Sequence, residues 1–229
     1  MSSGQPSRSR LAITALVRLV AAFVILLGFF LLSAGTVAYW EAWAYMTVLF
    51  VPMTLVLVYL FWKDPGLLER RMRTREREAE QGLVVKLGSL CYLLIFLLPG
   101  FDRRFGWSEV PVVAVVVADI LFLLGYGLFV LVLRENSYAS RVVEVEEGQR
   151  VIATGPYAIV RHPMYVAVIV IFVATPVALG SWWAVLPALP LIALLVARIR
   201  NEEKVLLREL EGYSEYSQVT KYRLIPGAW

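Results

Sequence analysis

Two short runs in the C-terminal half of the chain combine charged and aromatic residues beside a long apolar segment. Residues 155–165 read Gly-Pro-Tyr-Ala-Ile-Val-Arg-His-Pro-Met-Tyr and include His162, the only histidine of the chain. Residues 198–203 read Arg-Ile-Arg-Asn-Glu-Glu. Arg198 and Glu202 are four residues apart and would share one face of a helix. A guanidinium binds a carboxylate or phosphate by two parallel hydrogen bonds, and a carboxylate attracts a cation. The two runs therefore predict a ligand site.

Each run also has a purely structural interpretation. Pro163 suits the first turn of a helix, and Tyr157 and Tyr165 could anchor the chain at a membrane surface. Arg198 and Glu202 could form an exposed ion pair worth at most about 1 kcal/mol. A third cluster, residues 212–216 followed by residues 222–227, by itself resembles a helix end and an interfacial tail.

Residue types and spacing exclude several other kinds of site. One cysteine, Cys91, and one histidine leave no intrachain disulfide, no cysteine-based zinc site and no multi-histidine metal centre. The Gly-Tyr-Gly run at 125–127 lies in an apolar stretch without a third glycine, which favours helix packing over dinucleotide binding. Basic residues alternate with acidic ones, which argues against a nucleic-acid partner.

The elements that position these residues follow from composition. Of the 229 residues 59% are hydrophobic and 17% are charged, and the mean hydropathy is +0.70. Soluble domains have about 45–50% apolar and about 25% charged residues, so we expect an all-α integral membrane protein. The first apolar run is too long for a cleaved signal peptide. Four transmembrane helices are predicted, at 11–37, 43–62, 83–99 and 110–133. Short interfacial turns are predicted at 39–43 and 101–107.

A helical hairpin is predicted after these four spans. Residues 164–197 carry no charge, and one helix of this length would be about 51 Å long, against a bilayer core of about 30 Å. Pro176, Gly180, Pro187 and Pro190 interrupt the run. A cytosolic helix that continues to Glu211 should follow. We expect one structural domain, with transmembrane helices in 1–133 and the cofactor-binding and catalytic region in 134–229.

Two polar segments separate the spans. Residues 63–82 are rich in charges of both signs and predict a solvated loop. In the second segment, residues 141–145 and 149–152 flank Glu-Glu-Gly and favour a small β-hairpin. Within the spans, Lys86 is near one end and can extend its ammonium to the surface. Asp119 lies deeper and is either functional or a structural partner of Lys86, so it stays outside the predicted site.

The distribution of basic residues predicts the orientation. Eighteen of the 22 Lys and Arg residues lie in the N-terminus, the 63–82 loop, the 134–161 segment and the C-terminal tail, whereas the opposite side has only Arg103 and Arg104. Positive residues mark the cytosolic side of a membrane protein. The N-terminus and the candidate site should therefore be cytosolic.

Taken together, the clusters resemble the isoprenylcysteine carboxyl methyltransferase family, which is related to the phospholipid methyltransferases. The resemblance covers about residues 134–229, and the N-terminal spans match only as apolar helices. The motifs occur in the family's order: Gly-Pro-Tyr (155–157), Arg-His-Pro-x-Tyr (161–165), Arg-x-x-x-Glu-Glu (198–203), Gly-Tyr-x-x-Tyr (212–216) and Arg-Leu-Ile-Pro-Gly (223–227).

The resemblance implies S-adenosylmethionine as methyl donor and an acceptor that enters from the bilayer. Arg198 would face the acceptor and Glu202 would contact the donor, so these two would be the catalytic residues. The family often has histidine at the position of Gln149, and Asn136 and Tyr138 would be further contacts. The residues implied in cofactor binding are Gln149, Arg150, Val151, Ile152, Tyr157, His162, Pro163, Met164, Tyr165 and Glu202.

The physical chemistry is consistent with this assignment. The sulfonium of the donor is a cation, which suits a carboxylate and the faces of Tyr157 and Tyr165. Arg198 could orient an acceptor carboxylate without any base, whereas an amine acceptor needs a proton acceptor such as Glu202 or Glu203. Carboxyl O-methylation of an isoprenylcysteine-like or other lipid-like acid is the leading prediction.

Three alternatives stay open at this point. The first is N-methylation of a phospholipid amine. The second is a nicotinamide-dependent membrane reductase of the sterol type, because sterol reductases resemble this family in their C-terminal architecture. The third is a non-enzymatic scaffold or a small transporter, although a transporter should show internal repeats and polar residues at the membrane midplane. The oligomeric state is not predicted.

Overall fold

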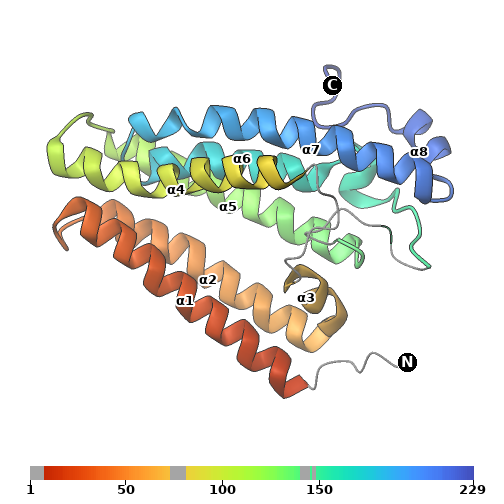
Figure 1. Ribbon diagram of the computed structural model, residues 1–229, viewed down its shortest axis with the longest axis horizontal. Coiled ribbons are helices and arrows are strands. Elements are labelled where there is room, and N and C mark those ends of the chain that lie inside the picture. The colour runs from red at the N-terminus through yellow and green to blue at the C-terminus, as the bar shows by residue number, and fades with distance from the viewer. Residues whose placement is uncertain (1–7, 73–80, 140–144, 146–147) are drawn as a thin grey trace.

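The computed structural model describes residues 8–72, 81–139, 145 and 148–229. Within these ranges the secondary structure is helical throughout and contains no strand (Figure 1). The elements in chain order are α1 (Arg8–Ala34), α2 (Trp40–Lys63), α3 (Pro65–Met72), α4 (Gln81–Phe105), α5 (Val112–Glu135), η1 (Gly155–Ala158), α6 (Pro163–Ala178), η2 (Trp183–Val185), α7 (Ala188–Glu209) and α8 (Tyr213–Val219).

The long helices run back and forth between two ends of a bundle. We call the end that holds His162 the site end and the opposite end, which holds Gly180, the tip end; they lie to the right and left in Figure 1. Helix α5 packs along α6, and α1 packs along α4. Helices α1 and α2 run obliquely to α6 and α7 (Figure 1).

The all-helical membrane fold predicted from composition is confirmed. In the described part of the chain, α1, α2, α5 and the segment Trp183–Glu209 are long and apolar enough to cross a membrane, and α6 is a shorter apolar helix. The span predicted at 83–99 lies within α4. The predicted hairpin is formed by α6 and α7, which are separated by Gly180 at φ +74°.

Several local predictions are wrong. Residues 40–43 and 101–105 were expected in turns but are helical, because each helix continues past its apolar run. Residues 65–72 form α3 rather than a plain loop, since Leu67 and Leu68 are buried. Of the predicted β-hairpin, residues 149–152 are irregular because Val151 packs on α8 rather than on a strand. Of the other arm, 141–145, residue 145 is irregular and residues 141–144 lie outside the described residues.

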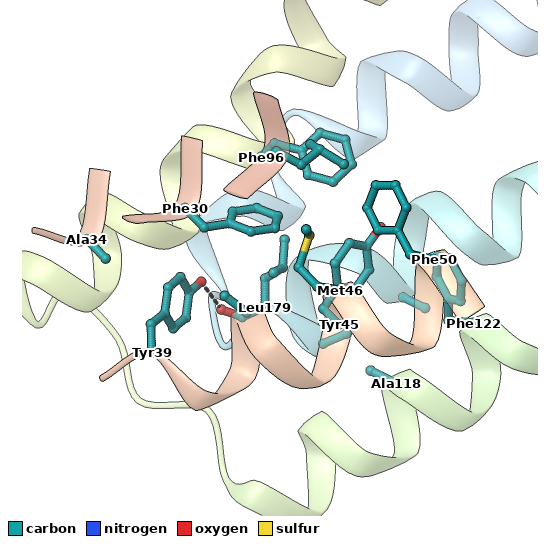
Figure 2. Packing of buried hydrophobic residues seen from close by; sticks show 14 residues of the cluster. Phe30, Ala34, Tyr39, Tyr45, Met46, Phe50, Phe96, Ala118, Phe122 and Leu179 are labelled. Carbon is teal, nitrogen blue, oxygen red and sulfur yellow. Dashed lines mark hydrogen bonds between the residues drawn. The ribbon is translucent and has the colours of Figure 1, made fainter. Parts of the chain in front are cut away.

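The main core joins α1, α2, α4, α5 and α6. Phe30, Tyr45 and Phe96 come from three different helices and pack with ring centroids 6.0 to 6.2 Å apart (Figure 2). Tyr39 closes the core at the tip end, where its hydroxyl donates to the carbonyl oxygen of Leu179 at 2.6 Å. This bond ties the start of α2 to the end of α6, so the hairpin is held against the N-terminal helices.

A polar cluster around Asp102 fastens the tip end. Asp102 is completely buried at the end of α4. Its Oδ1 accepts a hydrogen bond from the backbone N–H of Ser108 at 2.7 Å, and its Oδ2 accepts from the hydroxyls of Ser108 and Ser181 at 2.6 and 2.5 Å. Ser181 follows α6, so this one carboxylate joins the α4–α5 connection to the tip of the hairpin.

A close approach of α1 and α4 gives a testable consequence. A Cβ atom at Gly100 would lie 1.7 Å from the Ser33 hydroxyl oxygen and 3.0 Å from the Ala34 backbone nitrogen. We expect Gly100→Ala to destabilise the protein by about 1–3 kcal/mol, because the helices must move apart. Thermal unfolding in detergent measures this loss.

Gly127→Ala is the matched control, because nothing lies within 4 Å of the Cβ position of Gly127, which is also within a helix. It should cost nothing, since alanine favours a helix by up to about 1 kcal/mol over glycine. Equal melting temperatures for Gly100→Ala and the wild type would contradict the helix contact.

Candidate active site

The candidate site forms where the hairpin begins and ends at the site end. Pro163 opens α6, where its missing N–H costs no hydrogen bond. Just before it, the backbone N–H groups of Arg161 and His162 donate to the carbonyl oxygens of Tyr222 and Arg223 at 2.9 and 3.0 Å. These bonds bring the Arg-His-Pro motif against the C-terminal Arg-Leu-Ile-Pro-Gly motif.

Glu203 on α7 is the centre of a buried ionic cluster. Its Oε1 accepts a hydrogen bond from Nε of Arg161 at 2.7 Å and lies 3.4 Å from Nε2 of His162. Its Oε2 accepts from Nε of Arg223 at 2.5 Å. Glu203 is 6% exposed, and its partners hold both oxygens. Arg161 also donates to the carbonyl oxygens of Ser217 in α8 and of Thr220 and Lys221 just after it.

Glu202 faces a different part of the site, because consecutive helical residues point about 100° apart. The Tyr165 hydroxyl donates to its Oε2 at 2.5 Å and accepts a hydrogen bond from Nε of Arg198 at 3.1 Å. Nδ1 of His162 lies 3.9 Å from Oε1. The Glu202 side chain is 27% exposed, so a ligand can reach its carboxylate. Tyr165 thus links the two residues predicted as catalytic.

Tyr157 is fixed by contacts at both ends of the residue. Its hydroxyl accepts a hydrogen bond from Nδ2 of Asn136 at 2.9 Å, and its carbonyl oxygen accepts one from the Tyr216 hydroxyl at 2.7 Å. Burial raises the pKa of Tyr157 to about 12, although the bond from Asn136 opposes this shift. Tyr157 therefore stays a neutral phenol near pH 7. Gly155, two residues earlier, has φ +55°, which favours glycine, and a Cβ atom there would lie 3.1 Å from the Glu135 side chain.

The segment before Tyr157 is only partly gathered at the site. Val151 packs with Val145 against Leu210, Tyr213 and Tyr216, so its side chain supports the end of α7. Gln149 and Ile152 are half-buried, and Arg150 is exposed. Met164 is half-buried and contacts α3, where its sulfur lies 3.5 Å from Nη1 of Arg71. The Tyr138 hydroxyl donates to the carbonyl oxygen of Gly148 at 3.3 Å, in the segment between α5 and η1.

Asp119 lies apart from these groups, between the tip end and the middle of α5. Its Oδ1 is buried and has no hydrogen-bond partner among the described residues. Lys86, which the sequence suggested as a structural partner of Asp119, is exposed near the start of α4.

The assembled groups suit a cationic ligand next to an anionic one. Glu202 offers negative charge, and the rings of His162 and Tyr165 lie beside it with centroids 5.8 Å apart. Arg198 offers positive charge one helical turn before Glu202. The donors and acceptors thus fit a sulfonium compound that approaches an electron-rich acceptor. Residues 113–212 match the phospholipid methyltransferase family model.

The phospholipid methyltransferase match spans α5, the hairpin and the residues through Gly212, so it includes Tyr157, His162, Tyr165, Arg198 and Glu202. It confirms the relation to this family that the motifs predicted. It indicates a membrane methyltransferase that acts on lipid-like substrates. No curated protein matches the chain.

The partners of Glu203 were missed by sequence reasoning. Arg161 belongs to the Arg-His-Pro-x-Tyr motif and Arg223 to the Arg-Leu-Ile-Pro-Gly motif. Nothing in their spacing predicts that both bind one carboxylate on α7. Glu203 was considered only as a proton acceptor. Its two guanidinium partners make it a structural anchor, and they leave Glu202 as the more accessible carboxylate.

Proposed function

We propose that the protein transfers a methyl group from S-adenosylmethionine to a lipophilic acceptor, foremost the carboxylate of an isoprenylcysteine-like or other lipid-like acid. The observation that carries the proposal is the hydrogen-bonded chain from Arg198 through Tyr165 to Glu202. It joins a carboxylate, which suits a cationic ligand, to a guanidinium, which suits an anionic one, within the residues 113–212 that match the family model.

Glu202 would hold the donor. When bound, S-adenosylmethionine supplies a methyl group on a positively charged sulfur. The Glu202 carboxylate attracts this charge, and the Tyr165 and Tyr157 rings add cation–π attraction of about 0.5–2 kcal/mol each. His162, Pro163 and Met164 would form the wall of the donor site at the start of α6, and Gln149 to Ile152 would border it.

Arg198 would hold the acceptor. A guanidinium can orient a carboxylate with two parallel hydrogen bonds, and the carboxylate oxygen can then attack the methyl carbon as the carbon–sulfur bond breaks. No proton has to be removed in this reaction. Tyr165 keeps Arg198 and Glu202 at a fixed separation, so it is a positioning residue. We further propose that the site end faces the cytosol, since the Lys and Arg residues gather there.

The family match favours one rival, N-methylation of a phospholipid amine. This reaction releases a proton from the amine nitrogen, which needs a base. Glu202 is the candidate, because Glu203 is held by two guanidinium groups. An assay with labelled donor and two acceptors, a prenylthio carboxylic acid and phosphatidylethanolamine vesicles, separates the two reactions.

Calorimetry in detergent tests the donor site. Titration of S-adenosylmethionine into the wild type should show binding, and Glu202→Gln should weaken it by about tenfold or more, or about 1.4 kcal/mol, because the sulfonium loses its counter-charge. Glu215→Gln, an exposed substitution on α8, is the control and should bind as the wild type does. Folded wild type that binds no donor would overturn the proposal, and the nicotinamide cofactors would be titrated next.

A further inference from the structure

The hydroxyl of Tyr213, at the start of α8, is a buried polar group without a partner. Three buried side-chain oxygens form no hydrogen bond in the described part of the chain: Oε2 of Glu41, Oδ1 of Asp119 and the Tyr213 hydroxyl. Glu41 lies in the first turn of α2 and Asp119 lies in α5, so that of these three groups Tyr213 is the one at the site end. Buried polar groups in proteins are nearly always hydrogen-bonded, and an exception requires an explanation.

The second tyrosine of the same Gly-Tyr-x-x-Tyr motif has a structural use for its hydroxyl. The Tyr216 hydroxyl donates to the carbonyl oxygen of Tyr157 at 2.7 Å and so ties α8 to η1. The rings of Tyr213 and Tyr216 have centroids 5.7 Å apart, and the two residues are 4% and 7% exposed. Packing therefore explains the ring of Tyr213. It does not explain the hydroxyl, because a phenylalanine ring would pack in the same way.

The Tyr213 hydroxyl lies close to the charged groups of the candidate site. Burial raises the pKa of the Tyr213 phenol above its ordinary value, the charge of Glu203 raises it further, and the charge of Arg161 lowers it. The Glu202 carboxylate also acts on this hydroxyl. The phenol keeps its proton near pH 7, so it can donate one hydrogen bond and accept another. A neutral hydroxyl with free bonding capacity thus lies near the carboxylate that would hold the donor.

The side chains that pack around Tyr213 are apolar. Leu210 and Tyr216 are buried with it, and Leu206 and Val151 pack against this cluster. Val151 belongs to the irregular segment 148–152, which the proposed function places at the border of the donor site. Apolar walls with one neutral hydroxyl suit a flat, uncharged heterocycle, which has apolar faces and nitrogens at its edge. They do not suit a charged group, because burial without a counter-charge is costly.

We infer that the adenosine part of the donor binds between α8 and the segment with Val151, and that the Tyr213 hydroxyl forms a hydrogen bond with a nitrogen of its adenine. This inference rests on the proposed function for the identity of the donor. S-adenosylmethionine has an uncharged adenosine on one side of its sulfonium and an amino acid, with an ammonium and a carboxylate, on the other. With the sulfonium at Glu202, the uncharged side fits the apolar surroundings of Tyr213. The tyrosine lies one residue beyond the residues matched by the family model, 113–212.

Calorimetry with two probes tests the inference without any turnover. S-adenosylmethionine and methylthioadenosine, which has the same adenosine but neither a charge on sulfur nor an amino acid, are titrated separately into the detergent-solubilised protein. Tyr213→Phe removes the hydroxyl and keeps the ring. It should weaken binding of both probes by a similar factor of about tenfold, because a buried adenine nitrogen loses its partner. Glu202→Gln should weaken binding of S-adenosylmethionine much more than that of methylthioadenosine, because only the former carries a sulfonium.

Tyr222→Phe is the matched control for binding, because Tyr222 is an exposed tyrosine of the C-terminal segment. It should bind both probes as the wild type does. Thermal unfolding of the ligand-free proteins gives a second readout. Tyr213→Phe breaks no hydrogen bond among the described residues and should melt at the wild-type temperature or above, since loss of an unpaired buried polar group is neutral or stabilising. Tyr216→Phe loses its bond to Tyr157 and should melt at a lower temperature.

The outcomes separate this inference from the proposed function. If the wild type binds S-adenosylmethionine and Tyr213→Phe binds both probes equally well, the inference falls and the proposed function stands. A loss confined to S-adenosylmethionine would also overturn the inference, because the hydroxyl would then serve the charged part of the donor. A lower melting temperature of ligand-free Tyr213→Phe would show that the hydroxyl already has a partner within the protein, and would overturn it as well. If the wild type bound methylthioadenosine through Tyr213 but bound no S-adenosylmethionine, the adenosine site would stand and the methyltransferase proposal would fall. A folded wild type that binds neither probe would overturn both.

Discussion

Glu203→Ala is expected to lower the free energy of unfolding by about 3–5 kcal/mol. The substitution leaves the guanidinium groups of Arg161 and Arg223 without the carboxylate that both bind, and Arg161 is 9% exposed. Removing one partner of a buried ionic cluster has a cost of this size, because the remaining charge stays desolvated. For a chain of this length the melting temperature should fall by about 10 °C.

Glu209→Ala on the same helix is the matched control. Glu209 pairs with Arg208, and both side chains are largely exposed, at 42% and 65%. An exposed pair contributes at most about 1 kcal/mol, so this variant should melt close to the wild type. If Glu203→Ala had the same melting temperature as Glu209→Ala, the cluster around Glu203 would not be a structural anchor.

A second large effect is expected at the opposite end of the bundle. Asp102→Ala removes the acceptor of three hydrogen bonds, from the Ser108 N–H and from the Ser108 and Ser181 hydroxyls. Ser181 is completely buried and Ser108 is half-buried. A buried donor left without a partner costs about 1–3 kcal/mol, so the total loss should be about 3 kcal/mol or more. Thermal unfolding in detergent measures it.

Two comparisons make the Asp102 prediction specific. Glu109→Ala replaces an exposed carboxylate on the same connection and should be neutral. Ser181→Ala removes a single bond and should cost less than Asp102→Ala. Because the cluster lies at the tip end, the folded fraction of Asp102→Ala should bind S-adenosylmethionine with wild-type affinity. A change in donor affinity without a loss of stability would contradict this division of roles.

The sequence predicted the elements that depend on local composition. Apolar runs longer than a bilayer core required several helices, and the proline and glycine residues between 176 and 190 placed the hairpin where α6 and α7 are found. The contact between Tyr165 and Glu202 joins two motifs that were recognised as one site. In these cases the physical signal, length or residue type, lies within one short segment.

The remaining features depend on contacts between distant segments. Glu202 and Glu203 are adjacent and chemically equal, and their surroundings differ because Arg161 and Arg223 come from two distant segments to the same face of α7. Nothing in the residues 63–82 revealed α3, since its two buried leucines are surrounded by charges. The predicted β-hairpin failed for a related reason, because the apolar Val151 that suggested a strand is used to cover α8.

The position of Arg223 also determines an order of events during biosynthesis. A chain is made from its N-terminus onward, and folding begins before synthesis ends. Arg161, His162 and Glu203 leave the ribosome with the hairpin, whereas Arg223 and the carbonyl groups that bind Arg161 emerge later. The Glu203 carboxylate is therefore only partly neutralised until the C-terminal segment has been made. The N-terminal helices are already made at that stage. The C-terminal segment with Arg223 is made last, and its contacts complete the site.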